Sequence, residues 1–301
     1  MTVPNGEVET HELHASGRAD SRSRFGGVDG SRVAVDALAL LAVPLVMVAV
    51  FTLPTEVKRA YAFSYTEPTV VTAFTAHYVH LTATHLVGNL AGFFLLASLA
   101  YGLSLIGGRR HLFFVSMATF LVAFPFVLSG LNLAIPRNAI GFGFSGINMA
   151  LFGYVAVALV TVVGDRFEAD TYRYLPALFL TSVGYVAAHA LPVSTASAGL
   201  ALGALAVAIP YGRSAERHST QSLRQTVWRV LDTPGYGELF AVSVVVLLGY
   251  PFVGFPTPTP GGPRVNIYIH FLGYALAYTV VYVSLLADSS DHLLGPADGP
   301  R

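Results

Sequence analysis

The stretch Gly143-Phe144-Ser145-Gly146 opens an apolar run that continues from Phe144 to Val163. A run of about 20 apolar residues is long enough to cross a lipid bilayer once. Glycines allow other backbone to approach closely, and the first turn of a helix leaves amide N–H groups unpaired. A serine placed there has the surroundings that a nucleophile and an oxyanion site need. Small residues also serve helix packing alone, so the stretch by itself leaves both interpretations open.

Composition predicts the fold class. The chain has 301 residues, of which 54% are hydrophobic and 11% are charged, whereas soluble domains have roughly 25% charged residues. We therefore expect an all-α, polytopic membrane helix bundle. The chain contains no cysteine, which excludes disulfides and thiolate chemistry. Its formal net charge of zero gives no indication of nucleic-acid binding.

Eight apolar segments are candidates for membrane crossings. They are 37–53, 78–105, 112–131, 144–163, 175–191, 193–210, 238–255 and 267–287. The fifth and sixth, joined by Leu191-Pro192, read equally well as a re-entrant hairpin. Residues 1–32 are polar and predict a disordered tail, residues 33–287 a membrane domain, and residues 288–301 a second short tail.

The positions of Lys and Arg predict the orientation, because cytoplasmic loops of membrane proteins carry an excess of both. With eight crossings, most arginines fall on one side, namely Arg18, Arg22, Arg24, Arg32, Arg109, Arg110, Arg166, Arg173, Arg213, Arg217, Arg224 and Arg229. We expect that side to be cytoplasmic, with both termini there, in a multi-pass protein of the cell membrane. Ser145 then lies near the outer face. On the inner side, Leu223–Leu231 is expected to form a surface helix, with Trp228 at the interface.

Two other apolar segments carry polar side chains. His85 and Asn89 are four residues apart and therefore share one face of a helix. His270 is followed, three and seven residues later, by Gly273 and Ala277, which permit tight packing beside the histidine. Polar groups inside a membrane are energetically expensive and mark functional candidates. A hydrogen bond between helices would explain each histidine alone, so it is their combination with the serine stretch that favours a site.

Taken together, these motifs resemble those of the rhomboid family of intramembrane serine proteases. The family's Gly-x-Ser-Gly is matched by residues 143–146. Its His-x-x-x-Asn is matched by His85-Leu-Val-Gly-Asn89, with His80 at the place of a further upstream histidine. Its His-x-x-Gly-x-x-x-small is matched by His270-Phe-Leu-Gly-Tyr-Ala-Leu-Ala277.

The resemblance covers roughly residues 35–165 and 265–287, and it implies a rhomboid-like six-helix core with about two extra transmembrane helices within about 175–255. It implies a serine endopeptidase that cleaves transmembrane proteins in the lipid bilayer, without cofactor or metal. The implied site consists of the catalytic Ser145 and His270 and the supporting His85, Asn89, Gly143 and Gly146.

The chain also departs from the family's pattern. Three apolar segments, instead of one, separate the serine segment from the His270 segment. Met149 stands where the family often has an aromatic residue, and the first outer loop has Lys58-Arg59 in place of a Trp-Arg pair. These differences concern substrate gating and rate more than the chemistry.

Alternatives remain open from the sequence. One is an inactive relative that binds transmembrane helices, and another is a transporter or metal site lined by His77, His80 and His85. The chain has no His-Glu-x-x-His motif, and the segment 78–105 that these histidines begin contains no carboxylate to neutralise a cation. A third question is which histidine is the base, because His189 also lies near the outer face. Pro192, three residues after His189, is expected to end that helix, which favours His270.

Overall fold

The computed structural model describes residues 30–256 and 266–294, with side chains described up to residue 287. Most of the two expected tails lies outside the described residues. Helix α1 begins at Gly30 and helix α12 ends at Leu294. Residues 30–32 and 288–294, which the sequence placed in the tails, are therefore helical.

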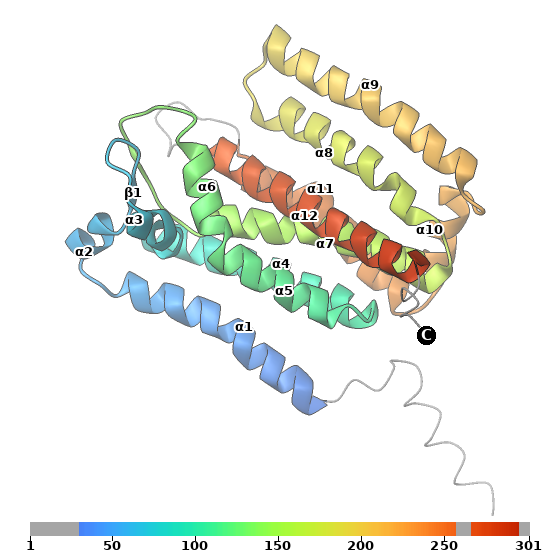
Figure 1. The fold of residues 1–301 in the computed structure, drawn as a ribbon, viewed down its shortest axis with the longest axis horizontal. Helices are drawn as coiled ribbons and strands as arrows, with labels where there is room; N and C mark the ends of the chain where they lie inside the picture. Colours follow the sequence, from blue (N-terminus) through green and yellow to red (C-terminus); the bar gives the residue numbers. More distant parts are fainter. Residues whose placement is uncertain (1–29, 257–265, 295–301) are drawn as a thin grey trace, which may run out of the picture. The chain divides into compact units, whose positions relative to one another are not determined.

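The described residues form twelve α-helices, two short 3-10 helices and one pair of two-residue strands (Figure 1). The expected all-α class is confirmed. The elements, in chain order, are α1 (Gly30–Phe51), α2 (Thr55–Ala60), β1 (Phe63–Ser64), α3 (Val70–Thr75), η1 (Ala76–Tyr78), α4 (Ala83–Ile106), α5 (Arg110–Val122), α6 (Phe124–Asn132), β2 (Ile140–Gly141), α7 (Ser145–Phe167), η2 (Thr171–Tyr174), α8 (Leu175–Ala190), α9 (Thr195–His218), α10 (Leu223–Leu231), α11 (Tyr236–Gly254) and α12 (Ile267–Leu294).

The chain divides into two compact units, and the boundary lies inside α1, between Val43 and Pro44. Of the first unit, only the beginning of α1 is among the described residues. All other elements belong to the second unit, and they contain every candidate site residue.

Six helices in the described part of the chain, α1, α4, α7, α9, α11 and α12, are long and apolar enough to cross a membrane. The pair α5 and α6, bent by 46° at a short break, makes a seventh if it is one span. The chain is therefore a multi-pass membrane protein. The expected count of eight is not reached by length, because α8 has only 16 residues, with Pro176 in its first turn and Pro192 shortly after its end. The four residues of η2 lead directly into α8.

Helix α7 lies at the centre of the second unit, and nearly all of its residues are buried. It packs against α4 on one side and α12 on another (Figure 1). A Cβ atom on Gly273 would lie 2.1 Å from the carbonyl oxygen of Gly146, and one on Gly153 would lie 2.5 Å from that of Tyr274. The backbones of α7 and α12 are thus in direct contact, which confirms the packing expected beside His270.

Helices α8 and α9 form an antiparallel pair (Figure 1). At their contact, a Cβ on Gly184 would lie 3.1 Å from the carbonyl oxygen of Ala201. Helix α8 also reaches α12, where the hydroxyl of Tyr278 donates a hydrogen bond to the carbonyl of Leu175 at 2.8 Å. Few residues of α9 are buried inside the protein, as expected for a helix that packs on α8 with one side and faces lipid with the others.

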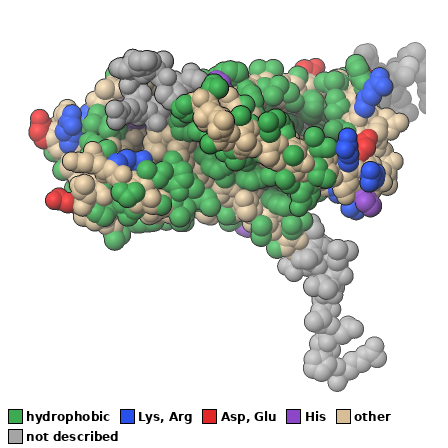
Figure 2. Space-filling model, turned by 90° about the horizontal axis from the view of Figure 1, so that it is seen from above, with side chains coloured by type: hydrophobic (Ala, Val, Ile, Leu, Met, Phe, Trp, Pro, Cys, Tyr) green, Lys and Arg blue, Asp and Glu red, His purple; other side chains and the backbone are tan. Residues whose placement is uncertain are grey.

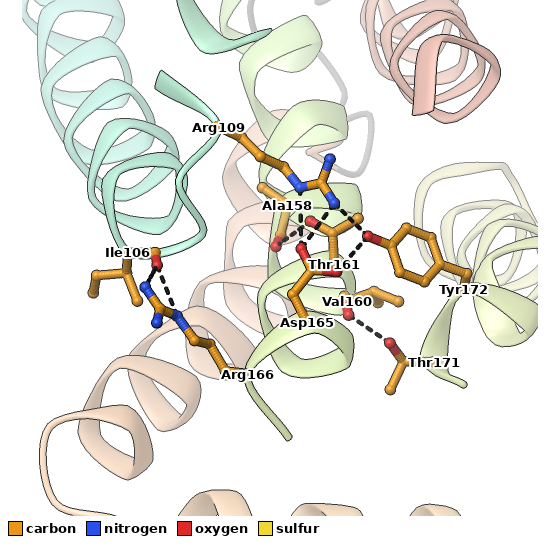
Figure 3. A network of polar contacts seen from close by, with 9 residues as sticks. All are labelled: Ile106, Arg109, Ala158, Val160, Thr161, Asp165, Arg166, Thr171 and Tyr172. Carbon is orange, nitrogen blue, oxygen red and sulfur yellow. Dashed lines mark hydrogen bonds and ion pairs between the residues drawn. The ribbon is translucent and has the colours of Figure 1, made fainter. Parts of the chain in front are cut away.

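A polar network joins the ends of α4 and α7 to η2 (Figure 3). Arg109 donates two hydrogen bonds to Asp165 at 2.8 and 3.2 Å, and Tyr172 donates one to the other oxygen of that carboxylate at 2.8 Å. Arg166 donates to the carbonyl of Ile106 at 2.9 Å, near the end of α4. Figure 2 shows that Lys and Arg side chains gather toward the ends of the view, with hydrophobic side chains over the middle.

Candidate active site

The backbone before Ser145 turns sharply, and this turn depends on glycine. Gly143 has φ +112, a conformation that side chains of L-residues rarely adopt. A Cβ there would also lie 2.5 Å from a ring carbon of His85. The Gly143 N–H donates a hydrogen bond to the carbonyl of Ala76 at 2.9 Å, which fixes the turn to η1. Ser145 follows as the first residue of α7, where helix amides have no partner within the helix.

Ser145 and His270, from α7 and α12, are in direct contact. The hydroxyl oxygen of Ser145 lies 2.6 Å from Nε2 of His270. Nδ1 of the same ring lies within hydrogen-bond distance of the carbonyl oxygen of Gly254. Because a carbonyl only accepts, Nδ1 carries the proton and Nε2 of the neutral ring is left as the acceptor for the serine hydroxyl. This is the tautomer that a general base requires.

The carbonyl of Gly254 belongs to the last residue of α11, where helix carbonyls lack partners within the helix. Met149 packs at this point, because a Cβ on Gly254 would lie 2.7 Å from its sulfur. Phe255, fully buried, contacts the His270 ring at a centroid distance of 6.2 Å. Met149 therefore contacts the helix end that orients His270. The sequence contained no signal for Gly254, since any helix end presents a carbonyl.

His85 and Asn89 lie on one face of α4, as expected, and line the same cavity as Ser145. The Asn89 amide donates one hydrogen bond to the carbonyl of His85 at 3.1 Å and has a second hydrogen left. The ring nitrogens of His85 have no hydrogen-bond partner among the described residues, and its ring lies 5.0 Å from that of His80. Both side chains thus retain donors that a bound group could use.

Asn148 is a site residue that the sequence reasoning missed. It lies three residues after Ser145, one turn along α7, and it is buried. Its side-chain amide donates to the backbone carbonyl of Asn89 at 2.9 Å and to the side-chain oxygen of Asn89 at 3.3 Å. Asn148 therefore fixes the orientation of the Asn89 amide. An asparagine within the buried run 144–163 was the available signal, because a polar side chain in a membrane helix requires a partner.

These residues line one cavity of about 1080 Å³. A second polar group lines it as well, where α6, the segment after it and the start of α12 meet. Here Asn132 accepts from Arg137 at 2.6 Å and donates to the hydroxyl of Tyr65 at 2.7 Å. Asn266 donates to the same side-chain oxygen of Asn132 at 3.2 Å. The cavity is therefore polar on two sides, which permits water beside Ser145.

Two further histidines lie near this site, and one of them, His77, also lines the cavity. His77 and His80 precede α4; Nε2 of His77 lies 3.1 Å from the hydroxyl of Ser129, and burial lowers the pKa of His77 to about 4. Nε2 of His80 accepts from the amide of Phe144 at 3.4 Å, and Nδ1 donates to the carbonyl of Tyr78 at 3.2 Å. Burial, with a smaller contribution from His85, lowers the pKa of His80 to about 4.

Neither His189 nor the Lys58-Arg59 pair lies at this cavity. The ring of His189 packs on that of Phe252 at a centroid distance of 4.4 Å. The amine of Lys58 donates to the carbonyl of Phe51 at 3.1 Å, at the end of α1. The structure therefore places His270, and not His189, against Ser145.

In the part of the chain that the structure describes, no group of three or more His, Asp or Glu side chains is arranged to hold a metal ion. Because both ring nitrogens of His80 are already hydrogen-bonded, the three histidines 77, 80 and 85 do not form a shared set of free ligands. No known protein family, curated protein or solved structure matches the chain.

Proposed function

We propose that this protein is an intramembrane serine endopeptidase of the rhomboid type. The observation that carries the proposal is the pair Ser145 and His270, whose side-chain atoms lie 2.6 Å apart, with the second ring nitrogen of His270 bonded to a carbonyl. The resemblance of three ordered motifs to that family supports it. The multi-pass helix bundle is the setting that such a reaction needs.

In the proposed reaction, the hydroxyl of Ser145 attacks the carbonyl carbon of the scissile peptide bond while Nε2 of His270 takes its proton. The imidazolium then gives this proton to the leaving amine. Water attacks the resulting ester in the second half of the reaction, with His270 again as the base. The backbone carbonyl of Gly254 holds the ring in place, a role that a carboxylate has in a full triad.

The negative oxygen of the tetrahedral intermediate needs donors close to Ser145. The backbone N–H of Ser145 lies at the start of α7, and the Asn89 amide and the His85 ring line the same cavity. Each is a donor of the kind that forms an oxyanion hole. In the proposed topology this site lies near the outer face, with both termini in the cytoplasm. The substrates are transmembrane proteins of the same bilayer, and no metal or cofactor takes part.

A fluorophosphonate probe, which reacts with an activated serine, tests the proposal on the full chain in detergent or vesicles. We expect labelling of the wild type and none of Ser145→Ala. The matched control is Ser284→Ala, at an exposed position on α12 outside the cavity. Cleavage of a single-pass model substrate should follow the same pattern. Labelling or cleavage that persists in Ser145→Ala would refute the assignment, and a wild type that binds the substrate helix without labelling would indicate the inactive alternative.

A further inference from the structure

Helix α10 connects two membrane-crossing helices and takes no part in the proposed site. Four residues, 219–222, separate it from α9, and four, 232–235, separate it from α11. Four extended residues span at most about 14 Å. Helices α9 and α11 both qualify as membrane spans, so α10 lies within that reach of the end of one span and the start of the next.

One side of α10 packs against α7 and α11. Thr226 and Val230, one turn apart, are buried on this side. On one flank of this packed side, Arg229 donates hydrogen bonds to the carbonyl of Phe167 at 3.2 Å and to the side chain of Gln221 at 2.5 Å. That flank is polar and its charge is already hydrogen-bonded within the protein.

The other flank is apolar and exposed. Leu223 and Leu231, with Val227 between them, form the stripe next to the buried one, because residues four apart lie above one another on a helix. Arg224 and Trp228 form the next stripe. Trp228 is 56% exposed, Leu223 44% and Leu231 42%. The apolar surface of α10 thus extends beyond its protein contact on one flank only, which suits a helix with protein on one side and lipid on the adjacent side.

Positive charge accompanies this flank. Arg224 lies in the same stripe as Trp228, and Arg213 and Arg217 lie in the last turns of α9, before the connection. Of the acidic residues nearby, Glu216 accepts hydrogen bonds from the hydroxyl of Tyr174 and from the amide of Leu223. Asp232, four residues after Trp228, is exposed at the end of α10, and the three arginines outnumber it. Arginines beside an exposed tryptophan at a membrane surface match the phosphate groups and glycerol region of anionic lipids.

We propose that the exposed flank of α10 is a lipid-binding surface, in which Trp228, Leu223 and Leu231 enter the interfacial layer and Arg224 binds the phosphates of anionic phospholipids. The partner is the bilayer that holds the protein. This surface ties the connection between α9 and α11 to the membrane, independently of any catalytic activity.

The chain has one tryptophan, Trp228, so its fluorescence reports on α10 without any labelling. The full chain is reconstituted into phosphatidylcholine vesicles with and without phosphatidylglycerol, and with lipids brominated near the headgroup. We expect emission at shorter wavelength than for indole in water, quenching by the brominated lipids, and a further shift when phosphatidylglycerol is present. Arg224→Gln should lose this further shift and its salt dependence. Arg59→Gln, exposed in the first loop, is the matched control and should retain both.

Emission typical of indole in water, with quenching by aqueous iodide and none by brominated lipids, would overturn the proposal. Quenching by brominated lipids that is equal with and without phosphatidylglycerol would overturn the assignment of anionic lipid as the partner. Neither readout depends on proteolysis.

Discussion

The backbone carbonyl of Gly254 accepts a hydrogen bond from Nδ1 of His270, although the two residues lie on different helices and 16 positions apart. This contact orients the ring so that its other nitrogen meets Ser145. No side-chain pattern in the sequence indicates position 254 as the partner of His270, because its contribution is a backbone atom. The end of α11 is therefore part of the candidate site, and a shift of α11 would change the orientation of the proposed base.

The choice of base predicts different effects for two histidines. His270→Ala should lower the turnover of a transmembrane substrate by about 10²–10⁴, the range for loss of a general base. His189→Ala should retain most of the turnover, because His189 packs on Phe252 away from the cavity. The measurement is the initial rate of cleavage in vesicles. Loss of turnover in His189→Ala alone would contradict the assignment.

The contact of Asn148 with Asn89 predicts an effect on rate with little effect on substrate binding. Asn148→Leu removes both hydrogen bonds to Asn89, so the Asn89 amide loses its fixed orientation. We expect kcat to fall on the order of tenfold, less than the ~10²–10³ for loss of a donor itself, as in Asn89→Ala. Thr161→Val, more than three helical turns further along α7, is the control. An increase in KM with unchanged kcat would argue against this role.

The contact between α7 and α12 predicts a loss of stability. In Gly273→Ala, the new Cβ would lie 2.1 Å from the carbonyl oxygen of Gly146, and neither backbone can yield without separating the helices. Overpacking of this kind costs about 1–3 kcal/mol. The midpoint of thermal unfolding in detergent should fall, together with activity. Gly102→Ala is the control, since no atom lies within 4 Å of the added Cβ and Ala favours the helix over Gly, so its unfolding midpoint should not fall.

His77 predicts a dependence of stability on pH. Burial lowers the pKa of His77 from 6.5 in the unfolded chain to about 4 in the folded protein, so the unfolded state binds more protons between these values. Above pH 6.5 His77 is neutral in both states and the free energy of unfolding does not depend on it. As the pH falls toward 4, the unfolded state takes up the proton first, and the free energy of unfolding decreases. One pKa unit corresponds to about 1.4 kcal/mol, so unfolding measured at pH 7, 6 and 5 should show a clear decline. His77→Asn should show a shallower decline, and an equal decline in both would refute this origin.

The arginine distribution predicts which ends of α9 face outward and inward. The chain has no native cysteine, so single cysteines can be introduced at Val193 and Ser214, both exposed and at opposite ends of α9. An impermeant maleimide added to intact cells should label Val193→Cys and should not label Ser214→Cys. After the cells are opened, both should react. The reverse pattern would refute the orientation, and labelling of both from outside would show that α9 does not cross.

The amino-acid sequence alone determined the fold class and the places of the apolar helices, because the length of an apolar run and the four-residue spacing of His85 and Asn89 are local properties. The motifs around Ser145 and His270, through their resemblance to a known family, also predicted these two residues as partners. The sequence did not determine the number of crossings, because whether the short helix α8 spans a bilayer depends on its neighbours. The tail boundaries expected from the sequence, after residue 32 and before residue 288, fall inside helices α1 and α12.

Only the tertiary structure decided how the candidate site is held together. The carbonyl of Gly254, the amide of Asn148 and the contact of Gly273 with the backbone of Gly146 join segments that are distant in the chain. The Gly254 carbonyl is a backbone atom, which every residue possesses, so no side chain indicates it in the sequence. The sequence does show that Gly273 is small, but not that Gly146 is its partner. The contact of Asn148 with Asn89 depends on which turn of α7 faces α4, and helix packing sets that angle. Local pattern identified the candidate catalytic residues, whereas the orientation of each one comes from atoms that only the packed helices bring within reach.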